Sequence, residues 1–258
     1  MTLVDLSIAE HVATVTLDRP DAMNAISSEV ADELAGAVLQ AGANAETWVV
    51  VLAAAGDRAF CVGADLKERA RLDDAGWMRN RVLMRALFES LRSLPQPSIA
   101  SVFGFALGGG FELALSCDLV VASEDAVFGL PEVTVGIVPG GGGTQLLARR
   151  IGPARAKELI FTGRRISAAD ALDLGLVARV VERDALAGAT AELAREIRRG
   201  SPVAVREAKL AVDRAMDVPL ADGIDLEDLA WRRAVASADR LEGIAAFNEK
   251  RDPRWSGR

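Results

Sequence analysis

The amino-acid sequence predicts an α/β fold, with buried parallel strands in its first part and a helical region at its C-terminal end. Residues 48–54 form a continuous apolar run, the pattern of a strand that is covered on both faces. Strand and helix patterns alternate through the first half of the chain, which is typical of parallel sheets. Helical periodicity dominates beyond about residue 153. We therefore divide the chain into a strand-rich core, residues 1–197, and a helical region, residues 198–258.

The first elements follow from local patterns. Residues 3–18 contain strand-like alternation on both sides of a turn and predict a β-hairpin. Residues 27–44 predict a helix, because Ser27 or Ser28 can cap its start and apolar side chains four residues apart share one face. The apolar run at 48–54 then predicts a central strand.

The later elements are predicted in the same way. Residues 74–93 form an amphipathic helix that Pro95 and Pro97 end, and a short strand follows at 99–102. The other segments are predicted as strands at 119–122 and 126–128 and as helices at 153–161, 168–174, 184–199, 202–216, 220–237 and 239–249.

Composition and charge exclude several classes of protein. The 258 residues include 30 basic and 37 acidic side chains, and a net charge of −7 argues against binding to nucleic acid or to an anionic membrane. Cys61 and Cys117 are the two cysteines, too few for a disulfide framework, which indicates a reducing compartment. No apolar stretch reaches the roughly 18 residues of a membrane span. The N-terminus lacks the basic residues of a targeting peptide, so we expect a cytoplasmic protein.

Three glycine-rich segments stand out, at residues 60–68, 104–114 and 128–144. The first follows the strand at 48–54, the second follows the strand at 99–102, and each opens a helix. Glycines at such positions let a ligand approach the backbone closely. Backbone N–H groups at a helix start also stabilise a developing negative charge. Two such amides from different loops would form an oxyanion hole.

Two carboxylates accompany these segments. Glu112 lies one turn into the second helix, within an otherwise apolar stretch, and Glu132 follows a Gly-Pro turn that leaves a strand. Each could be an ordinary capping or solvated residue, but a buried charge must be paired or neutralised. Two carboxylates beside an oxyanion hole are the groups required for general acid–base chemistry next to a carbonyl.

Other uses of the glycines are excluded by neighbouring residues. A phosphate-binding loop needs Gly-Lys-Ser/Thr, whereas Gly143 is followed directly by Thr144. The dinucleotide-binding pattern fails because Leu113 and Leu146 replace its third glycine. A Ser-His-Asp triad is not expected, since His11 is the single histidine and lies in the predicted hairpin. No clustering of ligand residues indicates a metal, so none is expected.

The segment from Val12 to Ala25, together with the three glycine segments, resembles the crotonase (enoyl-CoA hydratase/isomerase) superfamily. The similarity continues along nearly the whole chain, as far as residues 247–251. This resemblance implies a spiral of ββα units, followed by a helical C-terminal region that mediates trimer contacts. Two such trimers commonly stack into a hexamer, so we expect a homo-oligomer, either a trimer or a dimer of trimers.

The resemblance also implies roles for single residues. The amides of Ala64 and Gly109 correspond to the oxyanion hole. Glu112 corresponds to the base that activates water, and Glu132 to the acid that delivers a proton to C2. Gly140 matches a glycine that helps to seat the catalytic water. Contacts to the substrate and its coenzyme A are implied at Val62, Ala64, Asp65, Leu66, Lys67, Gly109 and Gly140. No separate cofactor is implied, because coenzyme A is part of the acyl-CoA substrate.

Because both glutamates are present, the resemblance favours hydration of a 2-enoyl-CoA to a 3-hydroxyacyl-CoA. A double-bond isomerase, which usually keeps only the equivalent of Glu132, is the alternative. The chain looks most similar to the methylglutaconyl-CoA hydratase branch, which includes RNA-binding members with a lysine-rich first helix. Here the matching helix, 27–44, carries three acids and no lysine or arginine, so it would repel phosphate and no nucleic-acid partner is expected. The acyl chain of the substrate stays open.

Overall fold

The computed structural model describes residues 2–258, and within them the strands form two sheets. The larger sheet contains, in spatial order, β1 (Val4–Ala9), β2 (Val12–Leu17), β3 (Val49–Ala54), β5 (Ser98–Val102), β7 (Leu119–Ser123) and β10 (Arg179–Val181). β1 and β2 form the predicted antiparallel hairpin, and each later neighbour is parallel. The α/β class with buried parallel strands is confirmed, since every residue of β5 is buried.

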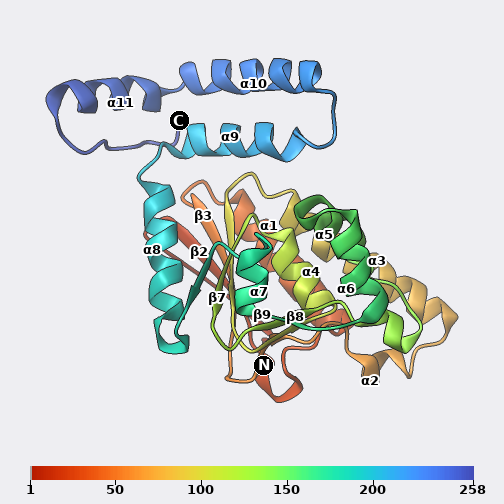
Figure 1. The fold of residues 1–258 in the computed structure, drawn as a ribbon. Coiled ribbons are helices and arrows are strands. Elements are labelled where there is room, and N and C mark those ends of the chain that lie inside the picture. The colour runs from red at the N-terminus through yellow and green to blue at the C-terminus, as the bar shows by residue number, and fades with distance from the viewer. Residues whose placement is uncertain (1) are drawn as a thin grey trace.

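The smaller sheet contains short strands. Its order is β4 (Ala59–Cys61), β6 (Phe105–Leu107), β8 (Val127–Gly129) and β9 (Ile166–Ser167). β4, β6 and β8 are parallel, and β9 pairs antiparallel with β8. A strand of the larger sheet is followed each time by a strand of the smaller one, as β3–β4, β5–β6 and β7–β8, before the chain turns into helical structure. This repetition is the expected ββα spiral (Figure 1).

Helices cover the sheets through the stripes that the sequence predicts. α1 (Ser28–Ala43) is capped by the Ser27 side chain, which accepts a hydrogen bond from the Val30 amide. α3 (Asp74–Arg92) packs against α1 and buries its own apolar face. α4 (Gly109–Ser116) is buried at every residue, so it forms the centre of the core.

The helices after β8 complete the core and then leave it. Those packed on the body are α5 (Gly143–Ile151), α6 (Pro153–Thr162), α7 (Ala168–Asp173) and α8 (Leu186–Arg198), with α2 (Leu66–Arg69) near the first glycine segment. Single 3₁₀ turns lie at Pro20–Ala22, Glu132–Val135 and Arg183–Ala185. α8 contacts β3, β5 and β7 of the larger sheet.

The last three helices stand away from the body (Figure 1). They are α9 (Pro202–Arg214), α10 (Leu220–Val235) and α11 (Ala238–Glu249). The C-terminal tail folds back on them, where buried Asp239 accepts hydrogen bonds from Ser201 and from the amides of Ser256 and Gly257. The division of the chain at residues 197/198 stays a prediction. Among residues 2–258, no helix combines the length and apolar character needed to cross a bilayer.

Several elements were absent from the sequence prediction. β4, β6, β9 and β10 contain two or three residues each, too few to show a period of two. α5 begins within a run of four glycines, Gly140 to Gly143, which reads as a loop in isolation. Packing against α4 and α6 holds this segment as a helix, and tertiary contacts therefore override its low local propensity.

Candidate active site

The three glycine segments meet around one cavity of about 800 Å³, which α2 and α3 close on the opposite side. Its wall includes Ala64, Gly109, Glu112 and Glu132. These residues come from the loop after β4, the start of α4 and the turn after β8. Because β4, β6 and β8 are adjacent parallel strands, their carboxyl ends deliver the three segments to the same edge.

The two predicted amides lie close together. A Cβ on Gly63 would lie 2.9 Å from the amide nitrogen of Gly109, so only glycine allows this approach of the two loops. Gly63 and Gly108 also have positive φ, at +88° and +53°, which side chains rarely adopt. Within residues 2–258 neither the Ala64 amide nor the Gly109 amide donates a hydrogen bond, and Gly109 begins α4. Both N–H groups are therefore available to an acceptor in the cavity.

Glu112 is fixed by the third glycine segment. Its side chain is 3% exposed, and Oε1 accepts hydrogen bonds from the amides of Gly141 and Gly143, each at 2.7 Å. Burial raises the pKa of this carboxyl above its ordinary value, while the loop amides and the charge of Arg81 oppose the rise. One carboxylate oxygen is thus used for anchoring and the other is left for chemistry.

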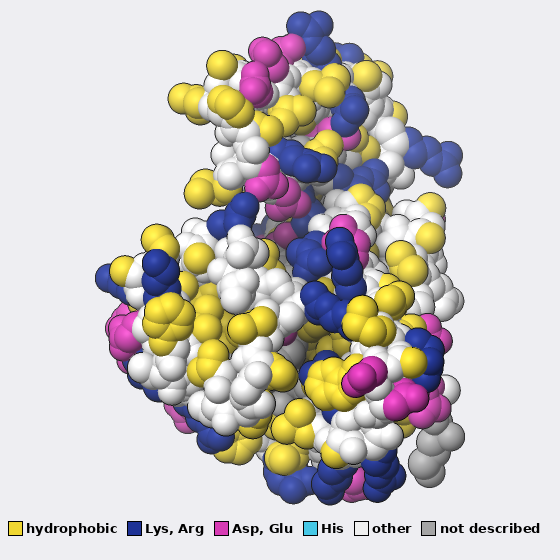
Figure 2. Space-filling model, turned by 90° about the vertical axis from the view of Figure 1, so that its right-hand side faces the viewer, with side chains coloured by type: hydrophobic (Ala, Val, Ile, Leu, Met, Phe, Trp, Pro, Cys, Tyr) yellow, Lys and Arg dark blue, Asp and Glu magenta, His cyan; other side chains and the backbone are white. Residues whose placement is uncertain are grey.

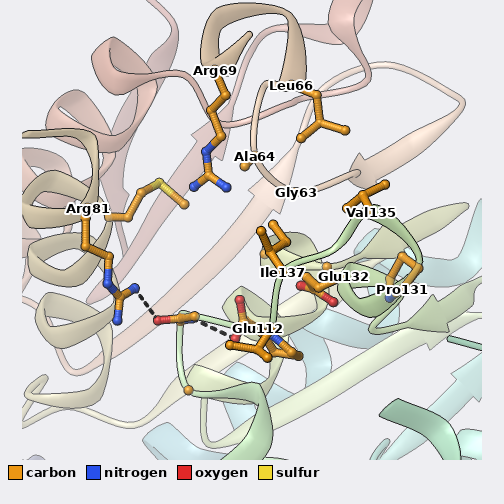
Figure 3. A pocket seen from close by; sticks show the side chains of 18 of the residues that line it. Gly63, Ala64, Leu66, Arg69, Arg81, Glu112, Pro131, Glu132, Val135 and Ile137 are labelled. Atoms are coloured by element: carbon orange, nitrogen blue, oxygen red, sulfur yellow. Dashed lines mark hydrogen bonds between the residues drawn. The ribbon is translucent and has the colours of Figure 1, made fainter. Parts of the chain in front are cut away.

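The carboxyl of Glu132 is less well hydrogen-bonded than that of Glu112. It begins the 3₁₀ turn after β8, and its buried Oε2 has no hydrogen-bond partner in the described residues. Burial raises the pKa of Glu132 to about 7, and the nearby charge of Glu112 adds to this effect. Figure 3 shows Glu112 and Glu132 facing the same space. Both carboxyls thus have raised pKa values, and the proximity of the two charges disfavours the ionisation of both at once.

Arginines of α3 hold the loop that anchors Glu112. The guanidinium of Arg81 donates to the Gly140 carbonyl at 2.5 Å, and that of Arg92 donates to the Gly141 carbonyl at 2.7 Å. Sequence reasoning missed these contacts. The available signal was their spacing of three helical turns, which places both arginines on one face of α3.

The other predicted substrate contacts divide into two groups. Val62, Leu66 and Gly140 line the cavity together with Ala64 and Gly109. Asp65 and Lys67 are not part of its wall. The Asp65 side chain instead caps α2 and forms a 2.7 Å ion pair with Arg19, while Lys67 is exposed to solvent.

Comparison with known proteins identifies the class to which this fold and site belong. The chain is a member of the enoyl-CoA hydratase/isomerase family, whose profile matches residues 7–258. The crystal structure of an enoyl-CoA hydratase from Bacillus anthracis is similar to 99% of this chain and 100% of its own, with a TM-score of 0.96 and 44% identity.

Two curated relatives extend the comparison. The mouse mitochondrial enoyl-CoA hydratase domain-containing protein 2 is 43% identical over 96% of this chain and 86% of its own length. The rat mitochondrial methylglutaconyl-CoA hydratase is 39% identical over 95% of this chain and 79% of its own. The family and the crotonase fold expected from the sequence are thereby confirmed.

Proposed function

We propose that this protein hydrates the 2,3 double bond of a 2-enoyl-CoA thioester and forms a 3-hydroxyacyl-CoA. The observation that carries this proposal is the meeting of two carboxyls, Glu112 and Glu132, with the free amides of Ala64 and Gly109 on one cavity wall. A single base would suffice to move a double bond, whereas addition of water requires both a base and a proton donor.

In the proposed reaction the thioester carbonyl accepts hydrogen bonds from Ala64 and Gly109. These bonds strengthen as enolate charge develops on the oxygen, so they stabilise the transition state more than the substrate. Glu112 takes a proton from a water molecule whose oxygen adds to C3, and Glu132 gives its proton to C2. Water is thus added in full, and proton exchange between the two carboxyls or with solvent restores the starting state.

The environments of the two glutamates support these assignments. Burial raises the pKa of Glu112, but two amides oppose this rise by stabilising its charged form, and they leave its second oxygen free for the water. With a pKa of about 7, Glu132 retains a proton over much of the neutral range. We place the coenzyme A arm along Val62 and Leu66 at the cavity edge, because Leu66 is 53% exposed there.

The test compares Glu112→Gln and Glu132→Gln on a 2-enoyl-CoA. Each variant should lose at least about 10²–10³ of the hydration rate, followed as loss of the conjugated thioester absorbance. In Glu112→Gln the side-chain carbonyl could still accept the Gly141 and Gly143 amides, so the loop should stay in place. Full hydration by the Glu112 variant would refute the proposal. Isomerisation of a 3-enoyl-CoA that only Glu132→Gln abolishes, without any hydration, would establish the isomerase instead.

We also propose that the chain self-associates through α9–α11. Leu220, Trp231 and Phe247 are 82%, 62% and 83% exposed, and other apolar side chains surround them. Figure 2 shows hydrophobic side chains on the surface of this upper part of the molecule. Such exposed apolar faces on paired helices are typical of subunit interfaces. A cytoplasmic location stays a prediction from the cysteine content.

A further inference from the structure

The direction of the Ala64 amide is set by a backbone segment that is distant in the sequence. The Ile26 amide donates to the Gly63 carbonyl at 2.8 Å, and the Asp65 amide donates to the Ile26 carbonyl at 2.9 Å, so Ile26 and Ala64 form an isolated parallel bridge. The peptide bond between Gly63 and Ala64 is trans, and its N–H therefore points in the opposite direction to its C=O. Because that C=O is bound to Ile26, the Ala64 N–H points away from Ile26. Gly63 and Ala64 both lie on the cavity wall (Figure 3).

Ile26 also lies close to the second amide of the site. A Cβ at Gly109 would lie 3.5 Å from Cδ1 of Ile26 and 3.7 Å from the Ala64 amide nitrogen. Ile26 itself is buried, with 1% of its surface exposed. The relative placement of the two oxyanion amides thus depends on where the segment around Ile26 is held.

A single side chain ties that segment to the oxyanion loop. Nη1 of Arg19 donates to the Ala25 carbonyl at 3.0 Å and to Oδ2 of Asp65 at 2.7 Å. Ala25 and Asp65 are direct neighbours of the two bridged residues, so Arg19 holds both sides of the bridge together. The Arg19 and Asp65 side chains are 30% and 10% exposed, and solvent therefore screens this ion pair less than a pair at the surface.

Both partners of the ion pair are fixed in turn. The Arg19 amide donates to Oδ1 of Asn24, a buried side chain that also donates to carbonyls at the end of β3 and the start of β4. Oδ1 of Asp65 accepts the first amides of α2. Burial would raise the pKa of Asp65, but the hydrogen bond and charge of Arg19, with the α2 amides, hold it below its ordinary value. Neither Arg19 nor Asp65 is part of the cavity wall, so they act on the cavity through the loop.

We propose that Arg19 is a positioning residue, which holds the Ala64 amide in the direction that stabilises the oxyanion through its bonds to Ala25 and Asp65. This inference rests on the proposed function, in which the thioester carbonyl accepts the Ala64 amide. A hydrogen bond weakens steeply as it departs from linearity, so a rotation of the peptide before Ala64 would weaken this stabilisation. Arg19 should therefore affect kcat more than KM, although it lies outside the cavity wall.

The first test measures turnover. We compare kcat and KM for hydration of a 2-enoyl-CoA by the wild type, Arg19→Met, Arg19→Lys and Arg58→Met. Arg58 is the matched control, because its exposed guanidinium donates to the Pro20 and Asp21 carbonyls of the adjoining 3₁₀ turn, outside the bridge. Arg19→Met should lower kcat by roughly 10- to 100-fold with a smaller change in KM. Arg19→Lys should retain more activity, since an ammonium can also donate to two oxygens, and Arg58→Met should keep the wild-type kcat.

A second measurement reports on the oxyanion hole directly. Butanoyl-CoA labelled with carbon-13 at its thioester carbonyl can be neither hydrated nor isomerised. Its carbonyl stretch, followed by isotope-edited infrared difference spectroscopy, moves to lower frequency as the oxygen accepts stronger hydrogen bonds. Binding to the wild type and to Arg58→Met should lower this frequency, and binding to Arg19→Met should lower it less. Asp65→Asn should also reduce the shift. Its side-chain oxygen can still accept the α2 amides, so this variant tests the ion pair even if Arg19→Met does not fold.

The outcomes separate this inference from the proposed function. A full carbonyl shift in Arg19→Met or Asp65→Asn would overturn the inference, and so would an equal loss of the shift in Arg58→Met; in each case hydration by the wild type would still support the hydratase. A wild type that only isomerises would refute hydration, whereas a carbonyl shift that depends on Arg19 would still support its positioning role. A wild type that shows no shift would refute the oxyanion hole and the inference together.

Discussion

Replacing Glu132 with glutamine should stabilise the protein at alkaline pH while it abolishes activity. The native state raises the pKa of this carboxyl from 4.5 to about 7, mainly through burial, so folding favours its protonated form. A glutamine of similar shape carries no charge at any pH. The variant therefore avoids the free energy that the native wild type spends on keeping a carboxylate in this position.

The magnitude and the pH window follow from that shift. Below pH 4.5 the carboxyl is protonated in both the folded and the unfolded chain, so its ionisation makes no difference to the stability of the wild type relative to the variant. As pH rises from 4.5 through about 7, the unfolded chain loses its proton first and the wild type loses stability. The full shift corresponds to about 3 kcal/mol, and partial solvent exposure reduces our expectation to about 1–2 kcal/mol. This equals roughly 3–6 °C in Tm.

The assay is thermal unfolding of both proteins at one concentration between pH 5 and pH 8.5. The Tm of Glu132→Gln minus that of the wild type should increase across this range and level off above the pKa of about 7. Glu124→Gln is the control, because Glu124 is an exposed turn residue outside the cavity. A difference that does not vary with pH, or a wild type that is more stable at pH 8.5, would show that Glu132 is not strained by its burial.

Three further predictions concern catalysis and one concerns assembly. Because Glu132 must be protonated to deliver its proton, kcat/KM for hydration should fall as pH rises through about 7; a value that stays constant across this range would contradict the assignment. Gly109→Pro removes one oxyanion donor and should lower the hydration rate by about 10²–10³. The variant should still fold, because proline is tolerated at the first position of a helix and a Cβ at residue 109 would meet its nearest atom at 3.4 Å. Arg92→Met releases the Gly141 carbonyl and should lower kcat by about tenfold with a smaller change in KM; an unchanged kcat would show that the loop needs no such support. Light scattering should give a mass several times 27.3 kDa at micromolar concentration, and a stable monomer would exclude association through α9–α11.

Helices and strands that are long enough to show a period are predictable from the sequence. The stripe of α1 and the apolar run of β3 appear in local patterns, because burial on one face or on both faces selects side chains at fixed spacing. The glycine segments were also identifiable, since positive φ at Gly63 and Gly108 excludes most other residues. Glu112 was expected beside the candidate oxyanion amides because it lies one turn into the helix that the second segment opens, and the resemblance to the crotonase superfamily implied that Glu132 joins it.

The contacts between these helices, strands and glycine segments follow from tertiary packing. The short strands β4, β6 and β8 become strands only by pairing side by side, and this pairing brings Glu112 and Glu132 to one cavity. No local pattern in the sequence shows that Arg69 lies in the cavity wall whereas Arg79 is exposed to solvent. The orientation of Arg69 is fixed by its contacts with Asn80 and Trp77, which form only after α2 and α3 have packed. The pKa of Glu132 is likewise a property of its surroundings. The burial of a side chain, its neighbours and its direction depend on contacts between segments that are far apart in the chain. The sequence of one segment therefore does not reveal these properties.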